Sequence, residues 1–191
     1  MDIHNDVILS PWQESWHWEF HLEKQSLIGI LQANEHDVEV FHVGSTSVKG
    51  MISKPIIDIL ICPDDNTEPA IIASELEGFG YRNLGECGRA GRFFLSSGDE
   101  PGKTFYVHVC HKSHQVAQDQ LLFQKLLRTS PEIFKGYFHL KLVLADAFPE
   151  ARFEYREAKG AYVKGILSAF KLGKLSDSEL AKNEETTETG L

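Results

Sequence analysis

The 191-residue chain contains 42% hydrophobic residues, which is enough to form the core of one ordinary domain. Its formal net charge of −9 argues against a large binding surface for duplex nucleic acid, because neutralising phosphates requires clustered lysine and arginine. A small anionic ligand is compatible with this charge, since a local basic pocket can exist in an acidic protein.

The cysteines and the hydropathy pattern indicate where the protein resides. Cys62, Cys87 and Cys110 stand at wide spacings without a C-x-x-C pair, which favours reduced thiols over a disulfide scaffold. No basic and apolar leader opens the sequence, and its most apolar stretch, residues 56–62, is too short to cross a membrane. We therefore expect a cytoplasmic protein that is not inserted into a membrane.

The first third of the chain predicts a helix followed by two strands. Apolar residues at helical intervals, preceded by Pro11, predict a helix over residues 12–32. Residues 38–43 alternate in polarity and are rich in β-branched and aromatic side chains, which is typical of a strand. Residues 56–62 form an almost continuous apolar run closed by Pro63, as expected of a central strand buried on both faces.

The middle of the chain predicts one further helix and three short strands. The helix is expected at residues 68–77 and a short strand at residues 81–84. Residues 92–96 and 104–111 have strand character and are joined by the turn-rich segment 97–102. This arrangement predicts a β-hairpin.

The last third predicts helices and then a polar tail. The helices are expected at residues 116–128, 131–147 and 150–170. Ser130 is suited to cap the second of them, with Pro131 at its first helical position. Residues 173–191 are too polar and acidic to bury the apolar surface that ordering requires. We therefore expect a single domain over residues 1–172, followed by a disordered acidic tail.

The segment from residue 42 to residue 59 carries the main functional pattern. A predicted strand runs into Gly44 and Ser45, whose backbone N–H groups and hydroxyl can hold a phosphate. Asp58 then lies within the apolar strand, where a carboxylate is costly to bury unless it meets a cation or a hydrogen-bond donor. A Gly-Ser pair alone is common in turns. Gly-Ser followed by a buried strand that carries aspartate is the arrangement of nucleotidyltransferases.

Two stretches around this turn form a longer motif. They read His-Val-Gly-Ser-Thr-Ser-Val-Lys-Gly over residues 42–50 and Lys-Pro-Ile-Ile-Asp-Ile over residues 54–59. This motif resembles the signature of the GrpB family, which is placed with the nucleotidyltransferase-like folds. The likeness runs from about residue 9 to residue 167. It implies an α/β (α+β) fold in which a nucleotidyltransferase-like mixed β-sheet of four or five strands has flanking helices and a C-terminal helical group.

The resemblance also implies roles for individual residues. Nucleotide or phosphate would be bound by Gly44, Ser45, Ser47, Lys54 and Tyr155. The catalytic residues would be Asp58, which holds a divalent cation such as Mg²⁺ or Mn²⁺, and Arg92 and Lys159, which stabilise developing charge. Some relatives resemble a domain fused to dephospho-coenzyme A kinase, which implies a small nucleotide or a coenzyme A-related ligand.

The sequence departs from the usual nucleotidyltransferase pattern at two positions. These enzymes carry a second acid two residues after the first, where this chain has Leu60. A third carboxylate is expected on a later strand, where this chain has His108. The usual two-metal arrangement is therefore not predicted.

Histidines offer an alternative metal site. His42, Asp58 and His108 could meet at one end of neighbouring strands, and imidazole with carboxylate suits zinc, manganese or iron. The other interpretation is that both histidines form hydrogen bonds inside a polar cleft.

The proposed roles of the basic residues also have plain structural alternatives. Arg92 should point to the sheet face opposite Phe93, either toward a phosphate or into a surface ion pair. Tyr155 and Lys159 share one face of the last helix, where they either close the cleft or form a solvated surface.

Three functions remain open from the sequence. The first is metal-dependent nucleotidyl transfer to an unknown acceptor. The second is a nucleotide- or phosphate-binding module without catalysis, which the missing second acid favours. The third is a metal-dependent hydrolase that uses His42, Asp58 and His108, which needs all three side chains within coordination reach.

Overall fold

The computed structural model describes residues 6–98, 104–173 and 175. The chain divides into two compact units, which we call the sheet unit (residues 11–121) and the helical unit (residues 1–10 and 122–191). The expectation of one domain over residues 1–172 stays a prediction. The tail expected at residues 173–191 lies outside the described residues, apart from positions 173 and 175.

The sheet unit contains a mixed β-sheet, as the sequence predicts. Within the described residues five strands pair in the order β1-β2-β5-β4-β3. Their bounds are β1 (Val38–Val43), β2 (Ile56–Pro63), β3 (Arg82–Asn83), β4 (Phe93–Ser97) and β5 (Thr104–Val109). β2 and β5 are parallel, whereas the other neighbouring pairs, including the predicted hairpin of β4 and β5, are antiparallel. The α/β fold class is therefore confirmed.

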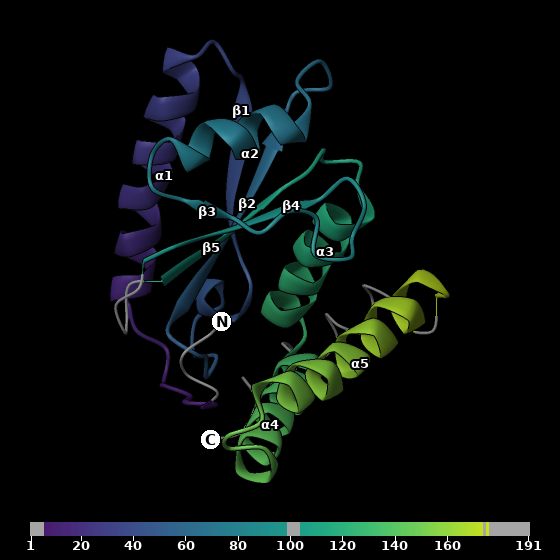
Figure 1. Ribbon diagram of the computed structural model, residues 1–191. Helices are drawn as coiled ribbons and strands as arrows, with labels where there is room; N and C mark the ends of the chain where they lie inside the picture. The colour runs from purple at the N-terminus through teal and green to yellow at the C-terminus, as the bar shows by residue number, and fades with distance from the viewer. Residues whose placement is uncertain (1–5, 99–103, 174, 176–191) are drawn as a thin grey trace, which may run out of the picture. The chain divides into compact units, whose positions relative to one another are not determined.

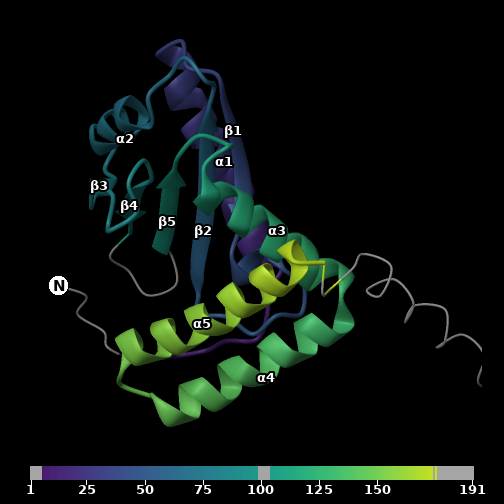
Figure 2. The ribbon, with the colours of Figure 1, turned by 90° about the vertical axis from the view of Figure 1, so that its right-hand side faces the viewer.

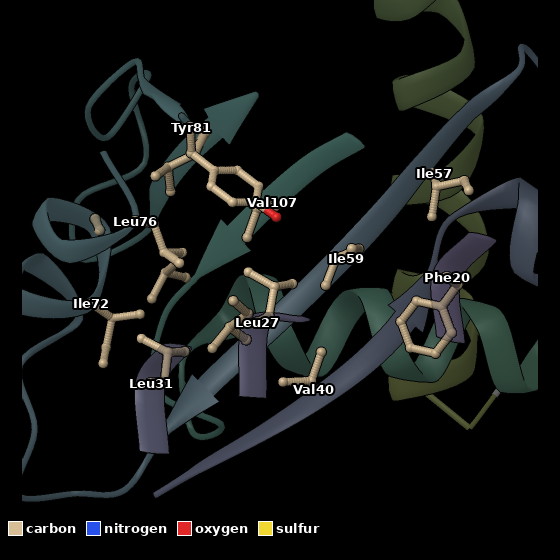
Figure 3. Close-up of a cluster of buried hydrophobic side chains, with 14 of the residues drawn as sticks. Phe20, Leu27, Leu31, Val40, Ile57, Ile59, Ile72, Leu76, Tyr81 and Val107 are labelled. Carbon is tan, nitrogen blue, oxygen red and sulfur yellow. The ribbon is translucent and has the colours of Figure 1, made fainter. Parts of the chain in front are cut away.

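One face of this sheet is covered by α1 (Ser15–Ala33) and α2 (Pro69–Glu77), which pack against the strands (Figure 1). Every second residue of the central strands points into this interface, as the two-residue period of a strand requires. Figure 3 shows side chains of α1 and α2 directed toward those of the strands, among them Leu27, Ile59 and Leu76. These three side chains have no exposed surface, so this interface forms the main apolar core.

The opposite face of the sheet carries a second, smaller apolar cluster. It consists of Val43, Leu60, Cys62, Cys110, Val116 and Ala117. Val116 and Ala117 lie at the start of α3 (Gln115–Thr129), which covers the part of this face near them. The three cysteines of the chain are free, as predicted.

The helical unit contains the end of α3 together with α4 (Pro131–Ala147) and α5 (Arg152–Lys171). Ser130 caps α4, because its Oγ accepts a hydrogen bond from the backbone N–H of Ile133 at 3.2 Å. α4 and α5 lie side by side (Figure 2) and bury Leu144 and Tyr155 with Val7. Over the described residues, no helix is long and apolar enough to span a membrane.

The central strand should dominate the stability of the sheet unit. Ile59 is fully buried in the main core, so Ile59→Ala removes apolar contacts and leaves a cavity. We expect the free energy of unfolding to fall by about 2–5 kcal/mol. Ile71→Ala is the control, because Ile71 is 47% exposed on α2. Urea denaturation compares the two variants, and equal losses would contradict the assignment of Ile59 to the core.

Candidate functional site

Asp58 lies on the sheet face opposite the main core. Its strand neighbours Ile57 and Ile59 are buried among α1 and α2, so the alternating backbone directs Asp58 the other way. Asp58 pairs with Val43 of β1 and with Tyr106 of β5. Its side chain is 31% exposed, which makes it a partly accessible carboxylate in an otherwise apolar strand.

Gly44 is pressed against this carboxylate. Its backbone has φ 70° and ψ −172°, a conformation that essentially only glycine adopts. A Cβ atom at this position would stand only 2.9 Å from Cγ and 3.0 Å from Cβ of Asp58. The turn after β1 and the Asp58 side chain can therefore occupy their positions together only because residue 44 has no side chain.

Hydrogen bonds hold the turn that follows Gly44. Residues Ser45–Ser47 form a single 3₁₀ turn, in which the Ser47 hydroxyl donates to the Gly44 carbonyl oxygen at 2.6 Å. Thr46 is almost fully buried, and its hydroxyl donates to the Ile56 carbonyl oxygen at 3.2 Å. Trp12 donates its indole N–H to the Thr46 carbonyl oxygen at 3.2 Å. The turn is thus tied to both ends of the loop between β1 and β2, and to Trp12 before α1.

The predicted phosphate-binding residues are partly accessible. Gly44, Ser45, Ser47 and Lys54 are all half-buried. Ser47 acts as a brace of the turn through its bond to Gly44, whereas Thr46 and Trp12 were not predicted from the sequence. Their only sequence signals are a threonine between two serines and an aromatic residue before the first helix.

The structure does not bring His42 to the same place as Asp58 and His108, which corrects the three-ligand interpretation. His42 lies on the α1 face of β1, where its ring stacks on Phe20 at 4.6 Å between centroids. Its Nε2 donates to the Thr46 hydroxyl at 3.0 Å. In the part of the chain that the structure describes, no group of three His, Cys, Asp or Glu side chains could hold a metal ion.

His108 does lie on the Asp58 face. Its Nε2 is 3.9 Å from Oδ1 of Asp58, which is longer than a hydrogen bond, and its side chain is 15% exposed. Its Nδ1 is buried, and among the described residues it has no hydrogen-bond partner. The pair is therefore close enough for both side chains to meet one ligand without being tied to each other.

Arg92 is buried rather than exposed. It is only 6% exposed, and its guanidinium carbon lies 5.3 Å from the centre of the Phe94 ring. The side chain thus points away from Phe93, which packs against the main core, as the strand alternation predicts. Burial lowers the pKa of Arg92. Its Nε–H is buried and has no hydrogen-bond partner within the described residues.

Tyr155 and Lys159 belong to the helical unit. Tyr155 is 1% exposed in the cluster with Val7 and Leu144, and burial raises the pKa of its hydroxyl. Lys159 Nζ lies 5.6 Å from the centre of the Tyr155 ring, so the two residues share one face of α5 as predicted. Their roles toward a nucleotide stay predictions.

The sheet unit thus contains a Gly-Ser turn in contact with an aspartate of the neighbouring strand. Comparison with known proteins shows the family to which the chain belongs. The family model described as GrpB protein matches residues 6–169. The chain belongs to the GrpB family. The chain is similar to the crystal structure of the conserved protein GrpB from Enterococcus faecalis, with a TM-score of 0.67 and 32% sequence identity. The match covers 84% of this chain and 99% of that chain.

Curated relatives are bacterial. A UPF0157 protein of Pseudomonas aeruginosa is 34% identical over 160 residues, which are 82% of this chain and 64% of the relative. A UPF0157 protein of Bacillus subtilis is 32% identical, over 83% of this chain and 45% of the relative. The chain therefore spans only about half to two thirds of these two relatives. The glutamate-rich protein GrpB of Alkalihalophilus pseudofirmus is 30% identical and is covered to 95%.

A more distant solved structure shows the same fold. A cytoplasmic RNA terminal U-transferase has a TM-score of 0.50 and 15% identity, over 71% of this chain and 42% of that chain. At this identity the likeness concerns the fold alone. The nucleotidyltransferase-like fold expected for this GrpB protein is thereby confirmed.

The contact between Gly44 and Asp58 can be tested by adding one methyl group. Gly44→Ala should lower the free energy of unfolding through backbone strain of about 1–3 kcal/mol and through the collision with Asp58. Gly80→Ala is the control, because Gly80 also has positive φ but nothing lies within 4 Å of its added Cβ. Thermal unfolding compares the variants, and a loss at Gly44 no larger than that at Gly80 would contradict the contact.

Proposed function

We propose that this GrpB protein binds a nucleoside triphosphate together with a divalent cation and transfers its nucleotidyl group to an acceptor hydroxyl. The observation that carries the proposal is the partly exposed Asp58 carboxylate directly beside the Gly44-Ser45 turn. This carboxylate is accessible enough to meet a cation, whereas its strand neighbours Ile57 and Ile59 are buried on the other face of the sheet. The adjoining turn offers backbone N–H groups to the phosphates.

The residues fit a cation of the magnesium type. Mg²⁺ is usually bound through one or two carboxylates, several waters and the phosphates of a substrate, so Asp58 alone is a sufficient anchor. His108, 3.9 Å from Asp58, adds an imidazole that suits Mn²⁺ or Zn²⁺ better than Mg²⁺. When bound, the cation would neutralise charge on the transferred phosphate.

The protein's own groups have separate tasks in this proposal. The backbone at Gly44 and Ser45 holds phosphate oxygens, while the bond from the Ser47 hydroxyl to the Gly44 carbonyl oxygen keeps the turn in shape. Lys54 supplies positive charge from the loop before β2. Arg92 contributes a buried N–H donor on the same sheet face.

The reaction is a displacement at phosphorus. The acceptor hydroxyl oxygen forms a bond to the α-phosphorus, and the bond from that phosphorus to the bridging oxygen breaks, so pyrophosphate leaves with the bonding electrons. The hydroxyl proton passes to solvent. Such a transition state requires above all positioning and charge stabilisation. A turn with fixed N–H groups and one anchored cation would supply both.

The second candidate is a binding module without catalysis, and the position of Leu60 favours it. Leu60 occupies the place of the usual second acid, and it is fully buried in the second apolar cluster. A second cation would have no carboxylate there. The hydrolase interpretation lacks support, because His42 lies on the other face of the sheet.

Replacing Asp58 tests the proposal. Wild-type protein should show a higher Tm with nucleoside triphosphate and Mg²⁺ or Mn²⁺ than with either alone, because a ligand at about 100 times its Kd adds about 2.7 kcal/mol of stability. Asp58→Asn removes the charge that anchors the cation and should abolish this increase. Asp65→Asn, at an exposed carboxylate after β2, should retain it.

Pyrophosphate release, measured with a panel of acceptors that carry hydroxyl groups, separates the two candidates. Release by wild type but not by Asp58→Asn supports transfer, whereas a Tm increase without release supports the binding module. No Tm increase with any of the four nucleoside triphosphates would reject both.

A further inference from the structure

Three aromatic side chains line the Asp58 face of the sheet next to the carboxylate. They are Phe94 of β4 and Tyr106 and His108 of β5, which we call the aromatic row. The Phe94 ring lies 5.1 Å from that of Tyr106 in an edge-on arrangement, and 5.1 Å from that of His108. Since Tyr106 pairs with Asp58 and His108 lies 3.9 Å from it, the row begins at the proposed cation anchor.

The row is not part of the main core. The strand neighbours Phe93, Leu95, Phe105 and Val107 all pack into the α1 and α2 interface, so the intervening aromatic residues point to the opposite face. All three rings there are half-buried. Ser96, which pairs with Tyr106, is a small and half-buried residue. Partly accessible aromatic rings therefore lie beside a charged group.

Arg92 provides an independent sign of a missing partner at this row. It is 94% buried, because its exposed fraction is 6%, and its guanidinium lies over the Phe94 ring. Its Nε–H has no hydrogen-bond partner within the described residues. A buried donor without an acceptor is unfavourable, so the position is suited to a ligand that presents an acceptor atom at the end of the row.

We propose that the aromatic row binds the base of the nucleotide, with Arg92 donating to an acceptor atom on the edge of that base. This inference rests on the proposed function, since it assigns the base of the same triphosphate. Aromatic side chains stack on nucleobases, and Arg is suited to acceptor atoms on base edges.

The geometry allows one ligand to reach both places. β5 separates β4 from β2, and Phe94 is level with Leu60, two residues along β2 from Asp58, so Phe94 and Asp58 are about 12 Å apart. An extended nucleoside triphosphate is longer than this. The phosphates can therefore lie at Gly44 and Asp58 while the base lies on the row.

The test compares triphosphates with and without a base. Wild-type protein is titrated with the Mg²⁺ complexes of ATP, GTP, CTP and UTP, and with Mg²⁺ tripolyphosphate, by isothermal calorimetry. At least one nucleotide should bind about tenfold more tightly than tripolyphosphate, which is the scale of a single base–aromatic stack. Phe94→Leu keeps an apolar side chain but removes the ring, and should abolish this difference without changing tripolyphosphate affinity.

Matched variants guard against general effects. Phe79→Leu makes the same change at a phenylalanine that is 56% exposed beyond α2, and should leave nucleotide affinity unchanged. Phe94→Tyr keeps the aromatic ring and should also retain the preference for nucleotide. If Phe94→Leu does not fold, as judged by circular dichroism, Tyr106→Leu takes its place.

The outcomes separate this inference from the proposed function. If tripolyphosphate and the nucleotides bind to wild type equally tightly, the aromatic row does not bind the base. The proposed phosphate site would not be affected by that result. The same conclusion follows if Phe94→Leu, like Phe79→Leu, leaves nucleotide affinity unchanged. If neither tripolyphosphate nor any nucleotide binds, the proposed function fails first and this inference fails with it.

Discussion

The close contact between Gly44 and Asp58 determines what this face of the sheet can do. The absence of a side chain at Gly44 lets the chain turn away from β1 directly over the carboxylate of β2. The turn is then held by hydrogen bonds of Thr46 and Trp12, which fix the backbone after Gly44. In the proposed function, such preorganised donors beside a carboxylate would need little rearrangement to bind phosphate and cation, because the loop is already ordered by folding.

The two-residue period of the strands separates the residues of this site from those of the core. Asp58 and His108 share a face because β2 and β5 are parallel neighbours in a register that pairs Leu60 with His108. His42 is also next to β2, yet its position in β1 places it on the α1 face. His42, two residues before Gly44, therefore supports the turn through its hydrogen bond to Thr46 and does not meet Asp58.

The sequence predicted the elements well, because hydrophobic periodicity and Gly/Pro punctuation are local signals. The strand at residues 38–43 and the helix at residues 131–147 were predicted with the bounds that the structure shows. It also located the Gly-Ser turn and Asp58. It misassigned His42 because a motif does not record which face each residue takes until strand pairing is known. It likewise gave no sign that Arg92 would be buried over Phe94, since that depends on contacts between β4 and its neighbours.

On the Asp58 face a single carboxylate lies beside an apolar cluster, and this limits how the proposed function can use a cation. Leu60 extends the second apolar cluster to within two residues of Asp58, so Asp58 is the one acid in β2. Lower negative charge weakens cation binding by the protein alone, so more of the coordination must come from the phosphates of the ligand. Cation and nucleotide would then bind cooperatively, because each supplies ligands or charge that the other lacks.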